Sequence, residues 1–206
     1  DAPANWLLEK AGIAPELLPE IVPGMGMQGQ ISARGAAESG LPEGTPILYR
    51  AGDQPNNALA LNVMEPGQVA ATGGTSGVVY AVTDRRETGE MSRINNFAHV
   101  NHRAGMPRIG KLLCINGTGI QYSWLKKQLG ETYSYAEMNR LAATVPPGSE
   151  GLRVYPFGNG AERMLENRHM GAQISGIDFN IHNPEHLCRA VLEGIAFAFV
   201  YGMEIM

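Results

Sequence analysis

The sequence predicts an α/β protein, in which helices alternate with strands and ligands gather where the strands end. A short apolar run ends in Gly52 and Asp53, and a helix of small residues is expected to follow over Pro55–Met64. Beyond that helix, two strand-type segments flank a glycine-rich turn: Gln68–Thr72, Val78–Val82 and, between them, Gly73–Gly77. These features, in this order, organise the rest of the chain.

Composition narrows the class of protein. With 206 residues and a hydrophobic fraction of 44%, the chain can bury a core in one or two domains. A net charge of −4 without a basic cluster argues against nucleic acid, and no apolar run is long enough for a membrane span. Cys114 and Cys188 fit no metal or CxxC spacing and are expected to be reduced core thiols. No signal peptide is apparent, so a cytoplasmic location is expected.

The elements before the turn follow from local patterns. A helix is expected over Asn5–Lys10, with Gly12 as its stop, and a short helical turn over Pro15–Leu18. A glycine-rich passage with weak strand character follows and runs through Gln30.

Asp53 is the candidate catalytic residue. At the carboxyl end of a strand its side chain would face a cleft, where an ionised carboxylate can take the proton of a hydroxyl group. Asp is also a favoured N-cap and Pro55 suits the first turn of a helix, so Gly-Asp alone favours a cap. Gln54 and Asn56 follow, and their amides could bind sugar hydroxyls because each offers a donor and an acceptor. A solvated helix surface is an equal alternative for Asn56.

The turn at Gly73–Gly77 is the candidate phosphate site. Glycine permits positive φ, so successive N–H groups can converge on an anion, and the hydroxyls of Thr75 and Ser76 add donors. Gly74, Thr75 and Ser76 are therefore expected to bind phosphate. An ordinary glycine-rich hairpin is the commoner use of such a turn on its own, and the sequence is not a Walker loop because no Gly-Lys-Ser/Thr follows.

Further elements are expected after the hairpin. Asp84–Met91 is a polar surface connection, and a helix that opens near residues 115–121 would carry Trp124, Leu125 and Leu129 on one face. A core helix over Glu185–Met206 would begin at the N-cap Asn183, with Gly194 permitting close approach of another element. The remaining expected elements are strands at Phe97–His102, Arg108–Ile115 and Leu152–Phe157, and a helix at Tyr135–Thr144.

Two widely separated motifs point to one family. The first is Gly-Asp-Gln, an Ala/Asn-rich helix, Glu65-Pro66-Gly67-Gln68 and Gly-Gly-Thr-Ser-Gly-Val. The second, more than ninety residues further on, is Ala172–Ile177, eight residues, and His186–Glu193. Together they resemble the FGGY carbohydrate kinases, the sugar-kinase branch of the actin-like and hexokinase-like ATPases, and the second fits that family's C-terminal signature at every defined position.

The resemblance implies a fold and a division of labour. The fold would be part of the actin-like, ribonuclease H-like ATPase fold of two-domain sugar kinases. In the first domain, a strand-like segment at Gly29–Ile31 and a short helix at Ala33–Ser39 would lead into the strand before Asp53, and the local patterns agree with that order. Residues 1–67 would end domain I, on the sugar-binding side, and residues 68–206 would form most of domain II, on the nucleotide side. Asp53 would be the catalytic base, Gln54 and Asn56 would bind substrate, and Gly74, Thr75 and Ser76 would hold the phosphates of ATP with Mg²⁺.

Further nucleotide contacts depend on a register. In the family, a Gly and a Gln four residues later contact the nucleotide, and Gly117 with Gln121 fits that spacing. Gly119 with Ser123 is the alternative, because the Trp-Leu pair of the next helix comes two residues late. Gly117 with Gln121 is the preferred pair.

The implied activity is transfer of the γ-phosphoryl group of ATP to a hydroxyl of a ketopentose. D-xylulose is the leading substrate because the domain, with Ala190–Gly194, looks most like xylulokinase, whereas Gly-Asp-Gln resembles the glycerol-kinase form. The alternatives are another kinase of the family, for glycerol, gluconate or ribulose, and a non-catalytic actin-like ATP-binding protein. The expected partners are a sugar or polyol and ATP, with a homodimer left open and no nucleic acid or membrane.

The ends of the sequence predict a fragment. The chain opens at Asp1, and Met206 stands inside an apolar helical pattern. Relative to the family, it lacks the amino-terminal Asp-Gly-Thr hairpin, most of the sugar-binding domain and a later Gly-Gly-Gly segment. By itself it is not expected to be a competent kinase.

Two smaller clusters complete the expectations. Glu162 and Arg163 resemble the family's Gly-Glu-Arg loop, and they would either pair to fix that loop near the interdomain cleft or form a surface pair contributing well under about 1 kcal/mol. His99 and His102 have no carboxylate or Cys nearby to complete a metal site. They are expected to be exposed strand or loop residues, and no metal site on the protein is expected.

Overall fold

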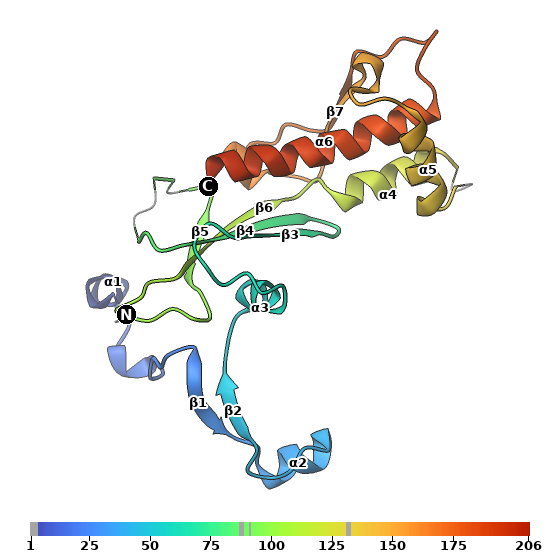
Figure 1. The fold of residues 1–206 in the computed structure, drawn as a ribbon. Coiled ribbons are helices and arrows are strands. Elements are labelled where there is room, and N and C mark those ends of the chain that lie inside the picture. The colour runs from blue at the N-terminus through green and yellow to red at the C-terminus, as the bar shows by residue number, and fades with distance from the viewer. Residues whose placement is uncertain (1–3, 87–88, 91, 131–132) are drawn as a thin grey trace.

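Over the residues that it describes, 4–86, 89–90, 92–130 and 133–206, the computed structural model centres on a four-stranded antiparallel sheet of order β3-β4-β6-β5 (Figure 1). The strands are β3 Val69–Gly73, β4 Gly77–Thr83, β5 Asn95–Ala98 and β6 Ile109–Ile115. Gly73 lies opposite Gly77, so the hairpin expected around the Gly-Thr-Ser turn is confirmed. The surface connection expected over Asp84–Met91 lies partly outside the described residues.

Helices and short ladders surround this sheet. The helices are α1 Asn5–Ala11, α2 Ala33–Ser39, α3 Asp53–Ala60, α4 Gly119–Gln128, α5 Tyr135–Thr144 and α6 Pro184–Ile205, with 3₁₀ turns η1 Pro15–Leu17, η2 Ser149–Gly151 and η3 Arg163–Leu165. β1 Met25–Gln30 pairs with β2 Pro46–Tyr49, and β7 Arg153–Tyr155 pairs with β8 Gln173–Ser175, both antiparallel. No helix in the described ranges combines the length and the hydropathy that crossing a membrane requires.

The sheet is covered on both faces because side chains alternate along each strand. Tyr80 and Leu112 pack with Ala58 of α3 on one face. Val79 and Leu113 pack with Ala198 of α6 on the other face. Figure 1 shows the same arrangement, with α6 above the sheet and α3 below it. The strands β4 and β6 therefore read as continuous apolar runs, since both of their faces are buried.

Capping residues fix several helices where the sequence predicts them. The side chains of Ser32, Ser134 and Asn183 accept backbone N–H groups at the starts of α2, α5 and α6, and α1 ends at Gly12 in the left-handed region. The expected helix after Asp53 is shorter than predicted. It ends at Ala60 because Asn62 takes a positive φ of 57°, which interrupts the helical ladder.

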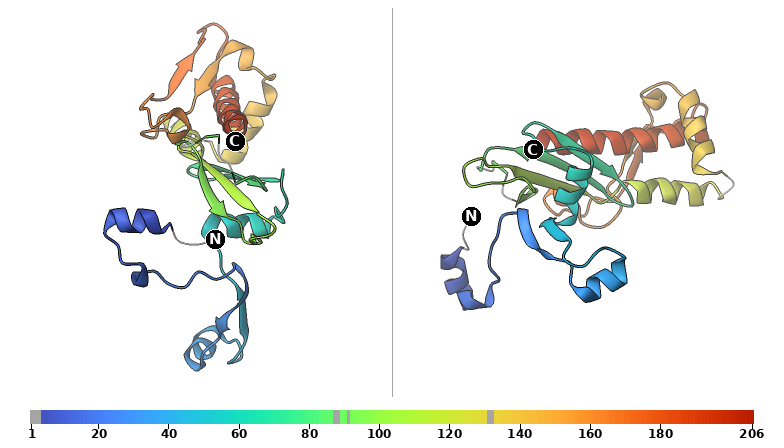
Figure 2. Two further views of the ribbon diagram at one scale, coloured as in Figure 1. Left: turned by 90° about the vertical axis from the view of Figure 1, so that its left-hand side faces the viewer. Right: turned by 60° about the horizontal axis from the view of Figure 1, so that its bottom comes forward.

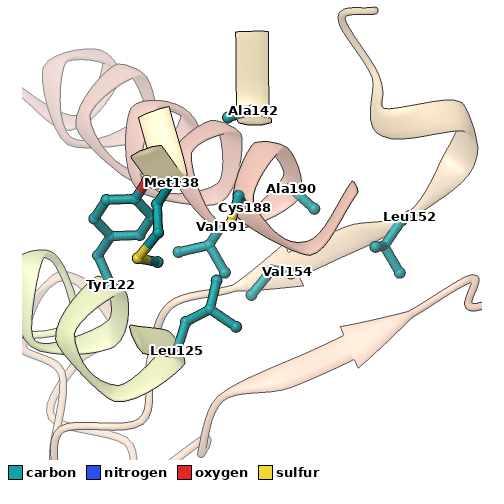
Figure 3. Packing of buried hydrophobic residues seen from close by; sticks show 9 residues of the cluster. All are labelled: Tyr122, Leu125, Met138, Ala142, Leu152, Val154, Cys188, Ala190 and Val191. Atoms are coloured by element: carbon teal, nitrogen blue, oxygen red, sulfur yellow. The ribbon is translucent and has the colours of Figure 1, made fainter. Parts of the chain in front are cut away.

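A second core joins α4, α5, α6 and β7 (Figure 3). Gly194 of α6 lies so close to β7 that an added Cβ would fall 2.1 Å from the carbonyl oxygen of Val154, so the expected close approach is confirmed. Leu125 is 2% exposed, but its neighbour Trp124 is 49% exposed, and the expectation that both share the buried face is wrong. Consecutive residues of an α-helix lie about 100° apart, so Leu125 alone faces the core.

The N-terminal segments form an arm that projects from the sheet (Figures 1 and 2). The β1–β2 ladder with α2 confirms the strand, helix and strand expected before Asp53. None of the residues of α1 or α2 is buried. The arm therefore contributes little to the cores and serves mainly to lead the chain into α3.

Candidate functional site

Asp53 is the first residue of α3 and is exposed. Gly52 is the N-cap, so the prediction that Asp53 itself caps the helix is wrong by one position. One carboxylate oxygen accepts the backbone N–H of Gln54 at 2.8 Å. The other has no hydrogen-bond partner within the described ranges. Asp53 therefore presents a carboxylate that can accept a further proton or hydrogen bond.

The helix that carries Asp53 packs against β3, the strand that leads into the Gly-Thr-Ser turn. Burial raises the pKa of the Cys114 thiol, Arg163 opposes this shift, and the charges of Glu162 and Asp53 add to it. Asp53 is thus close enough to act electrostatically on Cys114, which pairs with Val78 just after the turn. The candidate base and the candidate phosphate turn occupy the same end of the sheet.

The turn between β3 and β4 is held from behind by the first residues of α4. The carbonyl oxygens of Gly74 and Thr75 accept the N–H groups of Gly119 and Ile120, each at 3.0 Å. The hydroxyl of Thr118 also donates to both carbonyls, at 3.2 and 3.4 Å. The turn and the start of α4 are therefore one hydrogen-bonded unit.

These hydrogen bonds also set the direction in which the backbone N–H groups of the turn point. In a planar trans peptide the C=O and the following N–H point in opposite directions. Because the carbonyls of Gly74 and Thr75 face α4, the N–H groups of Thr75 and Ser76 point away from it. No acceptor in the part of the chain that the structure describes takes either of these two N–H groups. Two free amides beside two hydroxyls form a site suited to an anion.

A cavity of about 470 Å³ is lined by residues of the turn and of the helices α4 and α5. Its lining residues are Gly73, Gly74, Thr75, Gly119, Ile120, Tyr122, Ser123 and Tyr135. The rings of Tyr122 and Tyr135 stack with their centroids 5.7 Å apart. The volume and the mixture of amides, hydroxyls and aromatic rings fit a small-molecule site.

The cavity distinguishes the two registers considered for the nucleotide contact. Gly119 and Ser123 line it, whereas Gly117 and Gln121 do not. Gln121 is only 8% exposed, and a Cβ on Gly117 would fall 1.3 Å from the carbonyl oxygen of Pro156. While the preferred pair of Gly117 and Gln121 stays an untested prediction, the lining of this cavity favours the later register, Gly119 with Ser123. The reason is that α4 begins at Gly119, later than the sequence pattern indicates.

Glu162 and Arg163 do not pair with each other, so both alternatives predicted for them are wrong. The Glu162 side chain is 1% exposed and accepts the backbone N–H of Asn116 at 2.8 Å, while Arg163 donates to the carbonyl of Ser92 at 3.0 Å. Burial raises the pKa of Glu162, against the opposing effect of the backbone N–H groups of Asn116, Met164 and Gly117. No local pattern around Glu162 indicates its contact with Asn116, because Asn116 lies far away in the chain.

The amides that follow Asp53 are both accessible. Gln54 is half-buried, and Asn56 is exposed and accepts the hydroxyl of Tyr49 at 3.0 Å. A larger cavity of about 860 Å³ opens beside this region, lined among others by Arg50, Gly52 and Arg103. Sequence reasoning did not identify this cavity, because its walls come from distant segments.

His99 is buried rather than exposed, which corrects the prediction for it. It is 2% exposed, and its Nδ1 lies 2.9 Å from the hydroxyl of Tyr80. Burial lowers the pKa of His99, partly offset by a hydrogen bond to the backbone of Val63. Among the described residues, no group of three or more His, Cys, Asp or Glu side chains is arranged to hold a metal ion.

Comparisons with known proteins agree with this geometry. No known family profile matches the chain. The gluconokinase of Bacillus subtilis is 29% identical over 202 residues, covering 92% of this chain and 38% of that protein. The xylulose kinase of the same organism is 23% identical over 202 residues, covering 98% and 40%.

Solved structures give the same answer for the fold. The crystal structure of xylulose kinase from Rhodospirillum rubrum matches with a TM-score of 0.83 and 28% identity, covering 98% of this chain and 40% of that one. Glycerol kinase from Plasmodium falciparum, at 21% identity and a TM-score of 0.78, shares the fold. The chain thus spans 38% to 40% of the length of the curated relatives named above. In sequence and in fold, the chain is similar to FGGY-type sugar kinases, and it has part of their actin-like ATPase fold.

Proposed function

We propose that the protein containing this chain is an ATP-dependent carbohydrate kinase, which transfers the γ-phosphoryl group of ATP to a hydroxyl of a sugar or sugar acid. The observation that carries the proposal is the pair of free N–H groups at Thr75 and Ser76, aimed away from α4 at the end of the sheet that also holds Asp53. Phosphoryl transfer relies on positioning and on charge stabilisation, and these groups supply both.

Asp53 acts as the base in this proposal. Its free carboxylate oxygen accepts the proton of the attacking hydroxyl as the new O–P bond forms, and the γ-phosphoryl group leaves ADP. Its position at the first residue of α3 holds the carboxylate on a rigid element. Gln54 and Asn56, on the same helix turn, bind hydroxyls of the acceptor.

The turn binds the nucleotide. The N–H groups of Thr75 and Ser76 and their hydroxyls hold phosphate oxygens, and Gly74 keeps the backbone open for their approach. Gly119 and Ser123 border the same cavity and contact the nucleotide, in place of Gly117 and Gln121.

Magnesium fits this set of groups. Mg²⁺ usually keeps several waters and binds substrate phosphates, so it would enter with ATP and would need no cage of protein ligands here. When bound, the ion neutralises charge on the phosphates.

Two domains share the site in this proposal. Residues 1–67 carry Asp53 and the acceptor contacts, and residues 68–206 carry the turn and α4. Closure between them would bring the base and the phosphates together and exclude water. The boundary follows Gly67, which has a positive φ of 89° and precedes β3.

Two compounds are candidates for the acceptor substrate. D-xylulose remains the leading candidate, supported by the likeness to the xylulose kinase of R. rubrum in both sequence and fold. Gluconate is the second candidate. Arg50 and Arg103 line the 860 Å³ cavity beside α3, and two guanidinium groups would favour a sugar acid with a carboxylate.

The test is ADP release by the full-length protein with Mg-ATP, measured against D-xylulose, gluconate, ribulose and glycerol. Turnover with D-xylulose alone supports the leading assignment, and turnover with gluconate alone supports the second. An Arg50→Ala, Arg103→Ala double variant separates the two further, because it should raise the KM for gluconate and leave that for D-xylulose unchanged. Silence with every acceptor, with ATP binding retained, would favour a non-catalytic ATP-binding protein.

A further inference from the structure

We propose that Glu162 is a positioning residue for nucleotide binding: its buried carboxylate fixes the bend between β6 and α4, and this bend aims the amides of Thr75 and Ser76. The inference rests on the proposed function, because it concerns the same phosphate site. Glu162 touches neither reactant and acts through the backbone.

Three hydrogen bonds hold the bend between β6 and α4 at Asn116. Its N–H is held by the Glu162 carboxylate at 2.8 Å. Its side-chain amide donates to the carbonyl of Ala161 at 2.7 Å, and its own carbonyl accepts the side-chain amide of Asn159 at 3.0 Å. The loop from 159 to 162 thus holds one residue at its N–H, its side chain and its carbonyl.

The backbone at Gly117 is tightly packed. A Cβ there would lie 1.3 Å from the carbonyl oxygen of Pro156, so backbone packs directly on backbone. The Glu162 carboxylate holds the N–H of the preceding residue, Asn116, so the bend cannot shift toward the loop.

The residues that follow the bend contact the turn directly, so the position of the bend determines the position of the turn. Thr118 is buried, and Gly119 is so close to Gly74 that a Cβ would lie 2.2 Å from its carbonyl oxygen. The donors at Thr118, Gly119 and Ile120 hold the carbonyls of Gly74 and Thr75. A displaced bend would therefore rotate these carbonyls, and with them the N–H groups that follow.

The chemistry of the side chain explains why a carboxylate serves here. A carboxylate is an acceptor only: one Glu162 oxygen takes the N–H of Asn116, and the other is buried without a hydrogen-bond partner among the described residues. A glutamine has nearly the same shape but presents an NH₂ group, which would either oppose the N–H of Asn116 or be buried as a donor without an acceptor. The Glu162→Gln variant therefore disturbs the bend while it preserves the volume of the buried side chain.

The experiment compares Glu162→Gln with wild type in the full-length protein, by equilibrium binding of ADP, ATP and the acceptor identified by the turnover panel. The expected result is a dissociation constant about tenfold higher for both nucleotides, with acceptor binding within about twofold, because losing a hydrogen bond to a charged group corresponds to roughly that factor. The melting temperature is recorded alongside to give the folded fraction.

Glu193→Gln is the matched control. The Glu193 carboxylate also accepts a backbone N–H, that of Gly148 at 2.9 Å, and it belongs to the same helical core but has no contact with the turn at 74–76. A general loss of stability would affect both variants alike. Only Glu162→Gln should change the affinity for nucleotides.

A second variant keeps the inference testable if Glu162→Gln does not fold. Asn159 is exposed, and its substitution by Ala removes only the bond to the carbonyl of Asn116. This variant should raise the dissociation constant for ADP by about threefold, and combination with Thr118→Val should give a non-additive effect, since the two residues act on one bend.

Unchanged nucleotide affinity in folded Glu162→Gln, or in Asn159→Ala if the former is unfolded, would overturn the inference. Failure of the proposed function looks different: wild type would bind ADP but transfer no phosphoryl group to any acceptor. In that case the dependence of ADP affinity on Glu162 would still support the positioning role.

Discussion

The two halves of the candidate site are built in opposite ways. The turn at 74–76 is held by backbone hydrogen bonds from Gly119 and Ile120 and by a buried carboxylate behind them. Asp53 stands at an exposed helix start with one local bond, to the N–H of Gln54. The phosphate half is thus preorganised by the fold, whereas the acceptor half offers accessible side chains. Changes in the first should act through geometry and changes in the second through chemistry.

The largest expected effect lies in the acceptor half. Asp53→Asn keeps the shape of the side chain but removes its ability to accept a proton. The rate of phosphoryl transfer by the full-length protein should fall by about 10²- to 10⁴-fold, the usual contribution of general base catalysis. The measurements are the rate of ADP release at saturating acceptor and the affinity for ADP.

Asp84→Asn, at another exposed aspartate, is the control and should leave both values unchanged. A turnover rate for Asp53→Asn equal to wild type would show that another group is the base. A parallel loss of ADP affinity would show that the two halves are not separable.

The next effect lies in the phosphate half. Gly119→Ala places a Cβ 2.2 Å from the carbonyl oxygen of Gly74, so the turn and α4 must move apart. The free energy of unfolding should fall by about 1–3 kcal/mol, as for other overpacked sites, and ADP affinity should fall with it. Urea denaturation and ADP titration give the two numbers.

Gly105→Ala is the matched control, because a Cβ there meets nothing within 4 Å. It should be neutral in both measurements. Tight ADP binding by Gly119→Ala would mean that the contact behind the turn does not position the amides.

A pH dependence of stability separates the halves further. Burial lowers the pKa of His99, whose Nδ1 lies 2.9 Å from the hydroxyl of Tyr80 on β4. The unfolded chain therefore takes up the proton more readily than the folded one. Stability from His99 is therefore lost as pH falls below about 6.5, the pKa of an unperturbed histidine. For Glu162 the pKa is raised by burial, so its contribution has the opposite sign and is lost as pH rises through the folded value.

Urea unfolding of His99→Gln and Glu162→Gln from pH 5 to 8 checks these signs. The first variant should flatten the loss of stability in mild acid, and the second should steepen it. His169→Gln, at an exposed histidine, should follow wild type. A wild-type profile for His99→Gln would contradict the account of the Tyr80–His99 pair.

The smallest effect concerns Asn56. Tyr49→Phe removes the hydroxyl that donates to the Asn56 side chain at 3.0 Å, an exposed contact. If Asn56 binds the acceptor, the freed side chain should change the acceptor KM by no more than about threefold, because exposed hydrogen bonds contribute little. The KM for ATP should not change, and a change confined to ATP would place Asn56 in the wrong half.

Local chemistry made much of this fold predictable. The predicted N-cap Asn183 begins α6, and the strand-type segments on both sides of Gly73–Gly77 form the predicted hairpin. The candidate residues Asp53, Thr75 and Ser76 follow from the same reading, although their roles remain predictions.

Contacts between distant segments account for what the sequence did not reveal. The start of α4 is set by the carbonyls of Gly74 and Thr75, more than forty residues earlier in the chain. In the same way Glu162 reads as a surface charge until Asn116 supplies a backbone donor for it. His99 is buried because Tyr80 of β4, which β6 separates from the strand before His99, reaches its ring. Neither hydrophobic periodicity nor a capping residue indicates contacts between such distant segments.

The most direct test of the central claim is a crystal structure of the full-length protein with Mg²⁺ and a non-hydrolysable ATP analogue. The account predicts phosphate oxygens within about 3.2 Å of the backbone nitrogens of Thr75 and Ser76, with the bonds from Gly119 and Ile120 to the turn intact. Phosphates bound elsewhere, with these two amides facing only water, would contradict it.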